Sequence, residues 1–490
     1  MIRLREAPPI CRTRKHGKTA RMSGRSLARN RANGYTFAKP LVAGRNENLL
    51  KSEFVMTKAK SGLKIAIAGL GVVGSEVARQ LINRHGDLAI AAGQSLDIVA
   101  VSARDRSADR AFSLDGIDWY DDAAQLATRD NVDIIVEMIG GSEGVALDLA
   151  RASLSSGKHF VTANKAMIAH HGTELATLAE ANNAHLMFEA AVAGGIPAVK
   201  TLREGLAGNQ INRVAGILNG TCNYILSTME TTGRDFDEVL ADAQRLGYAE
   251  AEPSFDVDGI DAAHKLTILA AIAFGHQPDF NAVSIQGIRD VSSVDFAYAN
   301  QLGFRIKLVG VAEPGLMPRM QTCLLPLNSQ LAKVNGVLNA VEFHGTPVGS
   351  VLAVGPGAGG GATSSAVLSD LIDIAAGRGG LAFGKPISQL ADSSAVKNGA
   401  GPDKPFYVRL MVVDQPGVLA SVTAILQKHD ISIEGLLQQG RAPGDVVALV
   451  MTTHETPVAS LKKALDEMED LPIVKAKPVA MPILLADSEG

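Results

Sequence analysis

The chain has few cysteines, few aromatic residues and no long apolar run. Its 490 residues include three cysteines, Cys11, Cys222 and Cys323, too few and too scattered for a disulfide framework or a zinc site. Aromatic residues make up 4% of the chain, whereas glycine and alanine are abundant, as in parallel sheets covered by helices. No stretch of about 18 uninterrupted apolar residues occurs, so we expect no membrane span. These features indicate a protein of a reducing cytoplasm.

Acidic residues are scarce only at the N-terminus. Residues 1–60 hold 15 Lys and Arg against 3 Asp and Glu, although the whole chain has a net charge of -4. This segment lacks the hydrophobic core of a signal peptide. A transit peptide, a nucleic-acid arm and an extension that never folds are the alternatives. We favour the extension and expect no nucleic-acid partner, because a compact beginning starts at Met56.

A glycine-rich turn follows the first apolar run after Leu63. GLGVVG places Gly69, Gly71 and Gly74 at dinucleotide-binding spacing, between a strand pattern and a helix pattern. Gly69 would allow a tight turn, Gly71 would let the backbone approach a pyrophosphate, and the helix N-terminus would favour its charge. The motif therefore predicts a nicotinamide cofactor; a merely structural turn is the alternative.

The end of the next predicted strand, residues 97–103, bears on the choice between NAD and NADP. An acidic residue there would bind a ribose 2′-hydroxyl, whereas Arg104 would meet a 2′-phosphate. Asp105 follows immediately, so the signal is mixed. We expect NADP to be preferred, with dual use left open.

The order of elements predicts an α/β protein of several domains. Strands alternating with helices indicate a Rossmann doubly wound parallel sheet. An α+β catalytic and dimerisation domain follows. The last part has the order β-α-β-β-α-β of a ferredoxin-like unit, with its final strand near residues 473–479, and its DQPGVLA turn resembles ACT domains. The expected boundaries are 1–60 for the unfolded extension, 61–195 for the NAD(P)-binding domain (completed by about 355–390), 196–354 for the catalytic domain, 391–404 for a linker and 405–490 for the ACT regulatory domain.

Two lysines stand at positions that suit chemistry. The acidic segment GYAEAEPSFDVDGIDAAHK, residues 247–265, leads into an apolar helix with Lys265 at the join. A solvated loop is the alternative reading, but a lysine held among carboxylates is a candidate proton donor. A further strand is predicted over residues 159–165, and TANK with Lys165 forms its C-terminal end, at the sheet edge where such folds keep their ligands.

Six segments in order resemble homoserine dehydrogenases: GLGVVG, VEMIGG, TANK, EAAVAGGIP, NGTCNYIL and GYAEAEP with DVDGIDAAHK. The resemblance implies a monofunctional enzyme with a C-terminal ACT domain. Its reaction would be the reversible reduction of L-aspartate 4-semialdehyde to L-homoserine by NAD(P)H, in threonine and methionine biosynthesis.

The same resemblance implies roles for individual residues. Lys265 would protonate the developing alkoxide, and Lys165 would stabilise it and share proton transfer. Glu250 and Asp261 would bind the amino acid, with Asp256 supporting the site. The implied cofactor-binding residues are Gly69, Gly71, Val73, Gly74, Arg104, Lys165, Gly247 and Gly357. A monovalent cation, sodium by its hard oxygen ligands, would be held by Glu189, Val192, Gly194 and Ile196.

Two other functions are alternatives to this reading. A phosphorylating semialdehyde dehydrogenase would use Cys222 as nucleophile, but no histidine lies in its local segment to act as base, so packing is the favoured reading. A non-catalytic sensor would have no need of both Lys165 and Lys265. For the enzyme, the ACT turn suggests threonine as effector, and ACT pairing suggests a homodimer or homotetramer.

Overall fold

The computed structural model describes residues 62–392, 401–438 and 444–485. The expected N-terminal extension and most of the expected linker lie outside these ranges. Within the described ranges, no helix is both long enough and apolar enough to cross a membrane.

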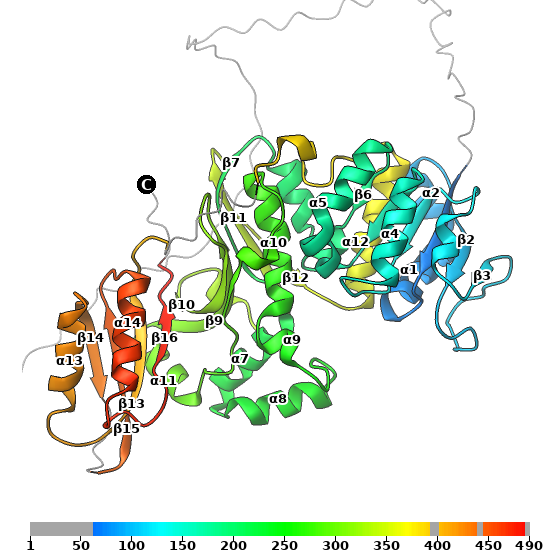
Figure 1. Cartoon of the computed structure of the whole chain (residues 1–490). Coiled ribbons are helices and arrows are strands. Elements are labelled where there is room, and N and C mark those ends of the chain that lie inside the picture. Colours follow the sequence, from blue (N-terminus) through cyan, green and yellow to red (C-terminus); the bar gives the residue numbers. More distant parts are fainter. Residues whose placement is uncertain (1–61, 393–400, 439–443, 486–490) are drawn as a thin grey trace, which may run out of the picture. The chain divides into compact units, whose positions relative to one another are not determined.

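The first sheet is parallel, with strand order β3-β2-β1-β4-β5-β6. Figure 1 labels its strands β2, β3 and β6. Its central strands are almost wholly apolar and buried, as expected of strands covered on both faces. The strands are β1 (Leu63–Ala68), β2 (Leu96–Ser102), β3 (Asp118–Tyr120), β4 (Ile134–Glu137), β5 (His159–Thr162) and β6 (Leu186–Met187).

Helices cover both faces of this sheet, which confirms the predicted doubly wound class. On one face, α1 and α2 pack with α12, a helix from much later in the chain. On the other face, α3, α4 and α5 pack together. Their bounds are α1 (Val72–Asn83), α2 (His85–Ala92), α3 (Ala124–Ala127), α4 (Val145–Ser155), α5 (Lys165–Ala181) and α12 (Gly360–Ala375).

The second sheet is mixed, with order β12-β11-β7-β9-β10-β8, and only the β10–β8 pair is parallel. Its strands are β7 (Gln210–Ile217), β8 (Ser284–Ile285), β9 (Phe304–Ala312), β10 (Arg319–Pro326), β11 (Leu338–Thr346) and β12 (Gly349–Pro356). The associated helices are α6 (Ala198–Lys200), α7 (Gly220–Thr232), α8 (Phe236–Arg245), α9 (Ser254–Val257), α10 (Ile260–Phe274) and α11 (Ser293–Gln301). Short turns of helix are η1 (Glu189–Ala191), η2 (Thr201–Gly205), η3 (Phe280–Ala282), η4 (Leu331–Lys333) and η5 (Ile387–Gln389).

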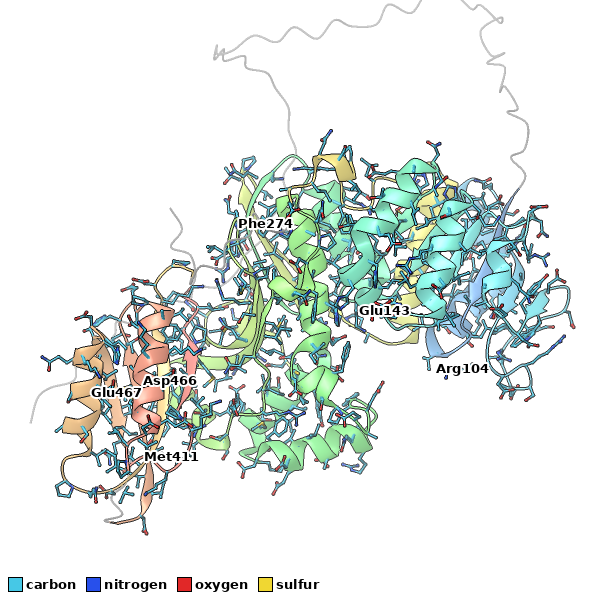
Figure 2. All side chains as sticks on the ribbon, in the orientation of Figure 1. Arg104, Glu143, Phe274, Met411, Asp466 and Glu467 are labelled. Atoms are coloured by element: carbon cyan, nitrogen blue, oxygen red, sulfur yellow. The ribbon has the colours of Figure 1, made fainter. Side chains whose placement is uncertain are left out.

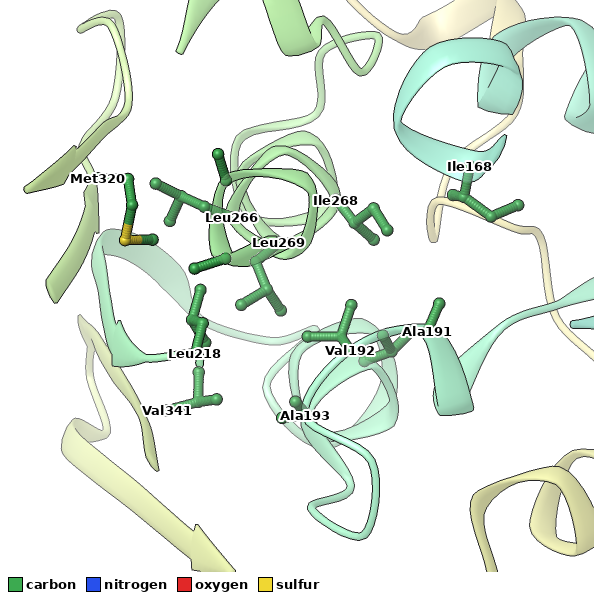
Figure 3. Packing of buried hydrophobic residues seen from close by; sticks show 14 of the residues in the cluster. Ile168, Ala191, Val192, Ala193, Leu218, Leu266, Ile268, Leu269, Met320 and Val341 are labelled. Carbon is green, nitrogen blue, oxygen red and sulfur yellow. The ribbon is translucent and has the colours of Figure 1, made fainter. Parts of the chain in front are cut away.

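Helix α10 lies in the middle of the core. Its sequence is apolar on nearly every side, which is the pattern of a fully buried helix. Figure 3 shows α10 end on, with Leu266 directed toward Met320 of the mixed sheet and Ile268 toward Ile168 of α5. The helix therefore packs between the two sheet layers, and its first turn is fixed with respect to both.

The C-terminal unit has the predicted ferredoxin-like order. Its elements are β13 (Phe406–Val413), α13 (Val418–Lys428), β14 (Ile433–Gln438), β15 (Val446–Thr453), α14 (Val458–Glu469) and β16 (Val479–Pro482), with sheet order β14-β15-β13-β16. The last strand was predicted near residues 473–479 and is found later. Lys475 and Lys477 are exposed, and the apolar run from Val479 supplies the buried strand instead.

A buried ion pair joins β13 to α11. Asp295 is fully buried and accepts hydrogen bonds from Tyr407 Oη at 2.8 Å and Arg409 Nε at 2.7 Å. The other Asp295 oxygen closes a capping box with Ser292 at the start of α11. The C-terminal unit is thus anchored to the mixed-sheet layer by a desolvated charge pair.

Candidate active site

Two adjoining cavities open where the parallel strands end. The glycine-loop cavity, about 530 Å³, is lined by the turns after β1, β2 and β4. The lysine cavity, about 600 Å³, is lined by the loop after β4, the start of α5 and one side of α10. Met138 and Ile139 line both. This edge of a doubly wound sheet is where such folds bind ligands.

The glycine loop has the shape that a pyrophosphate needs. Gly69 has φ +95°, and a Cβ there would lie 2.6 Å from the Met138 carbonyl oxygen. A Cβ at Gly74 would lie 1.9 Å from the Gly69 oxygen, so the helix approaches the turn closely. Gly71 has open space, and α1 begins just after it with no acidic residue in its first turn. These residues fit a dinucleotide phosphate.

The predicted cofactor residues fall into three groups. Gly69, Gly71 and Arg104 line the glycine-loop cavity, whereas Val73 and Lys165 line the lysine cavity. Gly74 supports the turn. Gly247 and Gly357 line neither of these two cavities. Gly357 instead packs so tightly against Asn339 that an added Cβ would lie 2.1 Å from the Asn339 side chain.

A cluster of arginines follows β2. Arg104, labelled in Figure 2, is exposed at the glycine-loop cavity, and Arg110 lines the same cavity. Arg110 is held by the carbonyl oxygens of Asp105 and Ala108 and lies over the Trp119 ring. The Asp105 carboxylate accepts hydrogen bonds from Ser107, which lower its pKa. Sequence reasoning missed Arg110, whose fixed position depends on Trp119 from β3.

The start of α5 places Lys165 at the lysine cavity. The segment 159–165 was predicted as one strand, but β5 ends at Thr162 and Lys165 is the first residue of α5. Asn164 makes the difference, because its side chain caps α5 by accepting from Met167 N and also donates to Gly141 O at 2.6 Å.

Glu137 fixes the loop that faces Lys165. This fully buried carboxylate ends β4 and accepts from the amides of Ile139 and Gly140 and from Thr162 Oγ1 at 2.5 Å. Sequence reasoning gave Glu137 no role. An acid at the carboxyl end of a buried strand is the signal that could have found it.

Both predicted catalytic lysines contact one carboxylate. Lys265 lies one helical turn after Asp261 on α10, so their side chains share a face. Its Nζ is 2.7 Å from Asp261 Oδ2 and 2.7 Å from the Leu218 carbonyl oxygen. Lys165 Nζ lies 3.1 Å from Asp261 Oδ1. Burial alone would raise the pKa of Asp261, but the charges of Lys265 and Lys165 outweigh it and hold that pKa well below its usual range.

Asn219 joins this group to the second predicted carboxylate. Its Nδ2 donates to Asp256 Oδ1 at 2.8 Å and to Asp261 Oδ2 at 2.9 Å. Burial raises the pKa of Asp256, and the bond from Asn219 opposes that rise. Sequence reasoning missed Asn219, although an asparagine before a helix start is a common N-cap.

Aromatic rings and a histidine pair form one wall of the lysine cavity. His264 stacks on Phe280 with centroids 4.1 Å apart, and Phe255 lies on it at 5.6 Å. His170 Nε2 is 3.2 Å from His264 Nε2. Burial lowers the pKa of His264 to about 4, so its ring is neutral near pH 7. Lys165 Nζ lies 5.7 Å from the Phe255 ring centroid, within cation–π range.

The other sequence candidates have different surroundings. Glu250 is exposed, and within the described part of the chain no ion pair links it to the lysines. Cys222 is fully buried on α7, its Sγ 3.2 Å from the Asp256 carbonyl oxygen. Burial raises the pKa of Cys222 well above its ordinary value. A thiol in that state does not suit nucleophilic attack, which fits the packing interpretation.

The turn after β6 has features of an oxygen-lined cation site. Glu189 is 2% exposed, and its carboxylate accepts from the amides of Val199 and Lys200. Ala193 and Gly194 both have positive φ, +56° and +51°, which is uncommon for alanine. Clusters of three or more His, Cys, Asp or Glu that could hold a metal are absent from the described residues, so any ion here would depend on backbone carbonyls.

Three family models match the chain. The model described as homoserine dehydrogenase matches residues 197–372, and that described as homoserine dehydrogenase, NAD binding domain, matches residues 69–189. The model described as ACT domain matches residues 406–473. The first two meet at the lysine cavity.

Relatives and solved structures agree with these models. A homoserine dehydrogenase of Neisseria gonorrhoeae is 40% identical over 431 residues, covering 86% of this chain and 98% of that protein. One from Pseudomonas aeruginosa is 41% identical over 425 residues, covering 84% and 96%. The crystal structure of a homoserine dehydrogenase from Thiobacillus denitrificans superposes with a TM-score of 0.79 at 38% identity, covering 86% of this chain and 98% of that one. A hyperthermophilic archaeal homoserine dehydrogenase in complex with NADPH gives a TM-score of 0.54 at 27% identity, covering 64% and 97%.

Proposed function

Because this chain belongs to the homoserine dehydrogenase family, we propose that it reduces L-aspartate 4-semialdehyde reversibly to L-homoserine, in threonine and methionine biosynthesis. The observation that carries the proposal is the shared carboxylate: Lys165, which lines the lysine cavity, and Lys265 approach the two oxygens of Asp261. A passive nucleotide sensor gains nothing from a buried and a half-buried lysine held on one carboxylate.

The residues of the site divide the chemistry among them. When bound, the nicotinamide cofactor supplies the hydride. Lys265 donates a proton to the carbonyl oxygen as that oxygen becomes an alkoxide, and Lys165 stabilises the charge and shares proton transfer. Asp261 orients both lysines. Glu250 and Asp261 bind the amino acid, and Asp256 supports Asp261 through Asn219. The cavity holds aldehyde and cofactor in line, which contributes to the rate by proximity.

We propose NADP as the preferred cofactor, with NAD also accepted. Arg104 and Arg110 supply two positive charges at the glycine-loop cavity. The Asp105 carboxylate is turned toward Ser107 by two hydrogen bonds, which leaves it less suited to a ribose hydroxyl. A 2′-phosphate is the group that two guanidinium ions would favour.

A monovalent cation, sodium by its ligand preference, is proposed at Glu189, Val192, Gly194 and Ile196. The left-handed turn at Ala193 and Gly194 and the buried Glu189 carboxylate support the proposal. Burial and the nearby Asp370 raise the pKa of Glu189 to about 7, and the charge of Lys200 offsets them only in part, so a further positive charge would stabilise the carboxylate. The ion would hold the turn between β6 and α6 and takes no part in the chemistry.

The C-terminal domain is proposed to bind threonine and to slow the enzyme as the end product accumulates. ACT domains suggest an amino-acid ligand, and the buried Asp295–Arg409 pair gives this domain a fixed contact with the mixed-sheet layer. A homodimer or homotetramer is proposed as well, because β12 and β14 are sheet edges that expose Val354 and Leu436. The protein is proposed to act in the cytoplasm.

The test of the reaction is direct. Purified protein is mixed with NADPH and L-aspartate 4-semialdehyde, and NADPH loss is compared with the homoserine formed. Equal amounts, together with the reverse reaction at alkaline pH, would support the proposal. NADPH binding without formation of homoserine would favour the non-catalytic sensor instead. Turnover unchanged by millimolar threonine would remove the regulatory part alone.

A further inference from the structure

We infer that Asn219 is a positioning residue that fixes the orientation and charge of two aspartates beside the catalytic lysines, the buried Asp261 and the half-buried Asp256. The inference rests on the function proposed above for Lys165 and Lys265, and it adds a residue to which neither the motifs nor the family comparison gave a role.

Every polar atom of the Asn219 side chain has a partner. The side chain is buried, with 5% of the residue exposed. Its Nδ2 donates one proton to Asp256 at 2.8 Å and the other to Asp261 at 2.9 Å, while its Oδ1 accepts from Cys222 N at 2.8 Å. A primary amide has two donors, and here each is used on a different carboxylate. The cap on α7 holds the amide at this angle.

This arrangement decides which oxygen of Asp261 meets which lysine. Oδ2 accepts from both Asn219 and Lys265, which leaves Oδ1 to Lys165 at 3.1 Å. Without the amide the carboxylate would be free to rotate about its own axis. The spacing of the two lysine ammonium groups would then vary, and proton donation requires a fixed one.

The Asn219 amide is also a neutral group placed between two negatively charged carboxylates. Asp256 on α9 and Asp261 on α10 repel each other, and Lys265 and Lys165 lie on the side of Asp261. The thiol of Cys222 also lies near Asp256, where it contacts the Asp256 backbone oxygen. Asn219 is therefore the neutral donor between the two carboxylates. A third acid at this point would leave three carboxylates facing two ammonium groups, and the acids would hold a shared proton to a higher pH.

The test compares N219D with N223D. N219D is isosteric and keeps the oxygen that caps α7, but it exchanges the double donor for a carboxylate. N223D makes the same amide-to-carboxylate change one turn later on the same helix. The buried Asn223 donates to the Val334 and Leu338 carbonyl oxygens and accepts from Lys307 Nζ, and its hydrogen bonds do not involve either aspartate. N219S serves as a second variant that keeps a cap while removing both bonds. NADPH affinity and melting temperature are measured for all three.

The expected result is a change in kcat and in its pH profile for N219D alone. At pH 8 its kcat should fall by about tenfold to a hundredfold, as expected when hydrogen bonds to charged groups are lost. As the pH falls the shared proton restores a donor, so kcat should rise toward pH 6, with KM for NADPH unchanged. N219S should show the loss of kcat at pH 8 without the rise of kcat toward pH 6. N223D should keep the wild-type shape.

The possible outcomes distinguish a failure of the role of Asn219 from a failure of the proposed reaction. Wild-type kcat and pH profile in N219D, with NADPH still bound, would overturn the role of Asn219 and leave the proposed reaction in place. An equal change of profile in N223D would do the same, because it would show a general effect of buried charge on α7. A wild type without semialdehyde reduction would remove the proposed function and this inference with it.

Discussion

Lys265 Nζ lies 2.7 Å from Asp261 Oδ2, one turn along the same buried helix. The pair carries a negative and a positive charge on side chains that are 9% and 10% exposed. A buried ion pair is stable when its geometry is good and its other polar atoms are satisfied, as Leu218 O and Asn219 Nδ2 ensure here. Asp261 thus fixes both lysines.

Removing the charge of Asp261 should therefore lower kcat strongly without preventing cofactor binding. In D261N both lysines lose their counter-ion, so we expect kcat to fall by about a hundredfold or more, the range for a displaced general acid. NADPH binding, measured by fluorescence, should be close to wild type. D258N is the control, because Asp258 pairs with Arg289 at the surface. Equal losses in both variants would contradict the assignment.

Cofactor preference should depend on the two arginines at the glycine-loop cavity. R104Q and R110Q should each raise KM for NADPH by about tenfold, the effect of one lost charge-assisted hydrogen bond, with little change for NADH. R106Q is the matched control, since Arg106 lies over Trp119 but does not line the cavity. A parallel rise for both cofactors would show that the arginines do not contact a 2′-phosphate.

The thiol of Cys222 should be dispensable. Because the residue is buried and its raised pKa keeps it protonated, C222A should retain the wild-type rate of semialdehyde reduction and should show no dependence on phosphate. The measurement is NADPH oxidation with and without phosphate. Loss of activity in a folded C222A would favour the alternative function, a phosphorylating semialdehyde dehydrogenase with Cys222 as nucleophile.

Stability should decline between pH 6.5 and 4 because of His264. Burial lowers its folded-state pKa to about 4, below the unfolded value, so in this window the unfolded chain binds the extra proton. The contribution is therefore full above about pH 6.5 and is lost progressively as pH falls toward 4. Urea unfolding of H264Q should show a shallower pH slope than wild type. The exposed His454 provides the control, H454Q, whose slope should not change.

The buried contact between β13 and α11 should matter for stability. D295N leaves the Arg409 guanidinium buried without its counter-ion, so the free energy of unfolding should fall by about 3–5 kcal/mol. The surface pair of Lys428 and Glu467 gives the control E467Q, for which we expect little change in stability; Glu467 is labelled in Figure 2. Equal stability of D295N and wild type would show that the contact is not formed in solution.

Local signals in the sequence were sufficient for much of the fold and part of the site. The glycine turn, the strand before Lys165 and the acidic segment before Lys265 each carry their meaning within about twenty residues, the scale of a strand–turn–helix unit. The parallel sheet and the ferredoxin-like order followed from the same kind of pattern.

The residues that were missed act over long distances in the chain. Asn219 is 42 residues from Asp261, and Glu137 is 25 residues from Thr162. Their side chains look locally like a helix cap and a strand end. Only tertiary packing shows that one amide serves two carboxylates. The role of Glu250 was implied by family resemblance alone and stays a prediction, because this exposed residue forms no ion pair with the two lysines among the described residues.

The central claim is that Lys265 is the proton donor in semialdehyde reduction. It is tested most directly by NADPH consumption with L-aspartate 4-semialdehyde in wild type and K265A. We expect the wild type to reduce the semialdehyde and K265A to do so at least about a hundredfold more slowly, the typical contribution of general acid catalysis. K265A that binds NADPH and still turns over at the wild-type rate would contradict it.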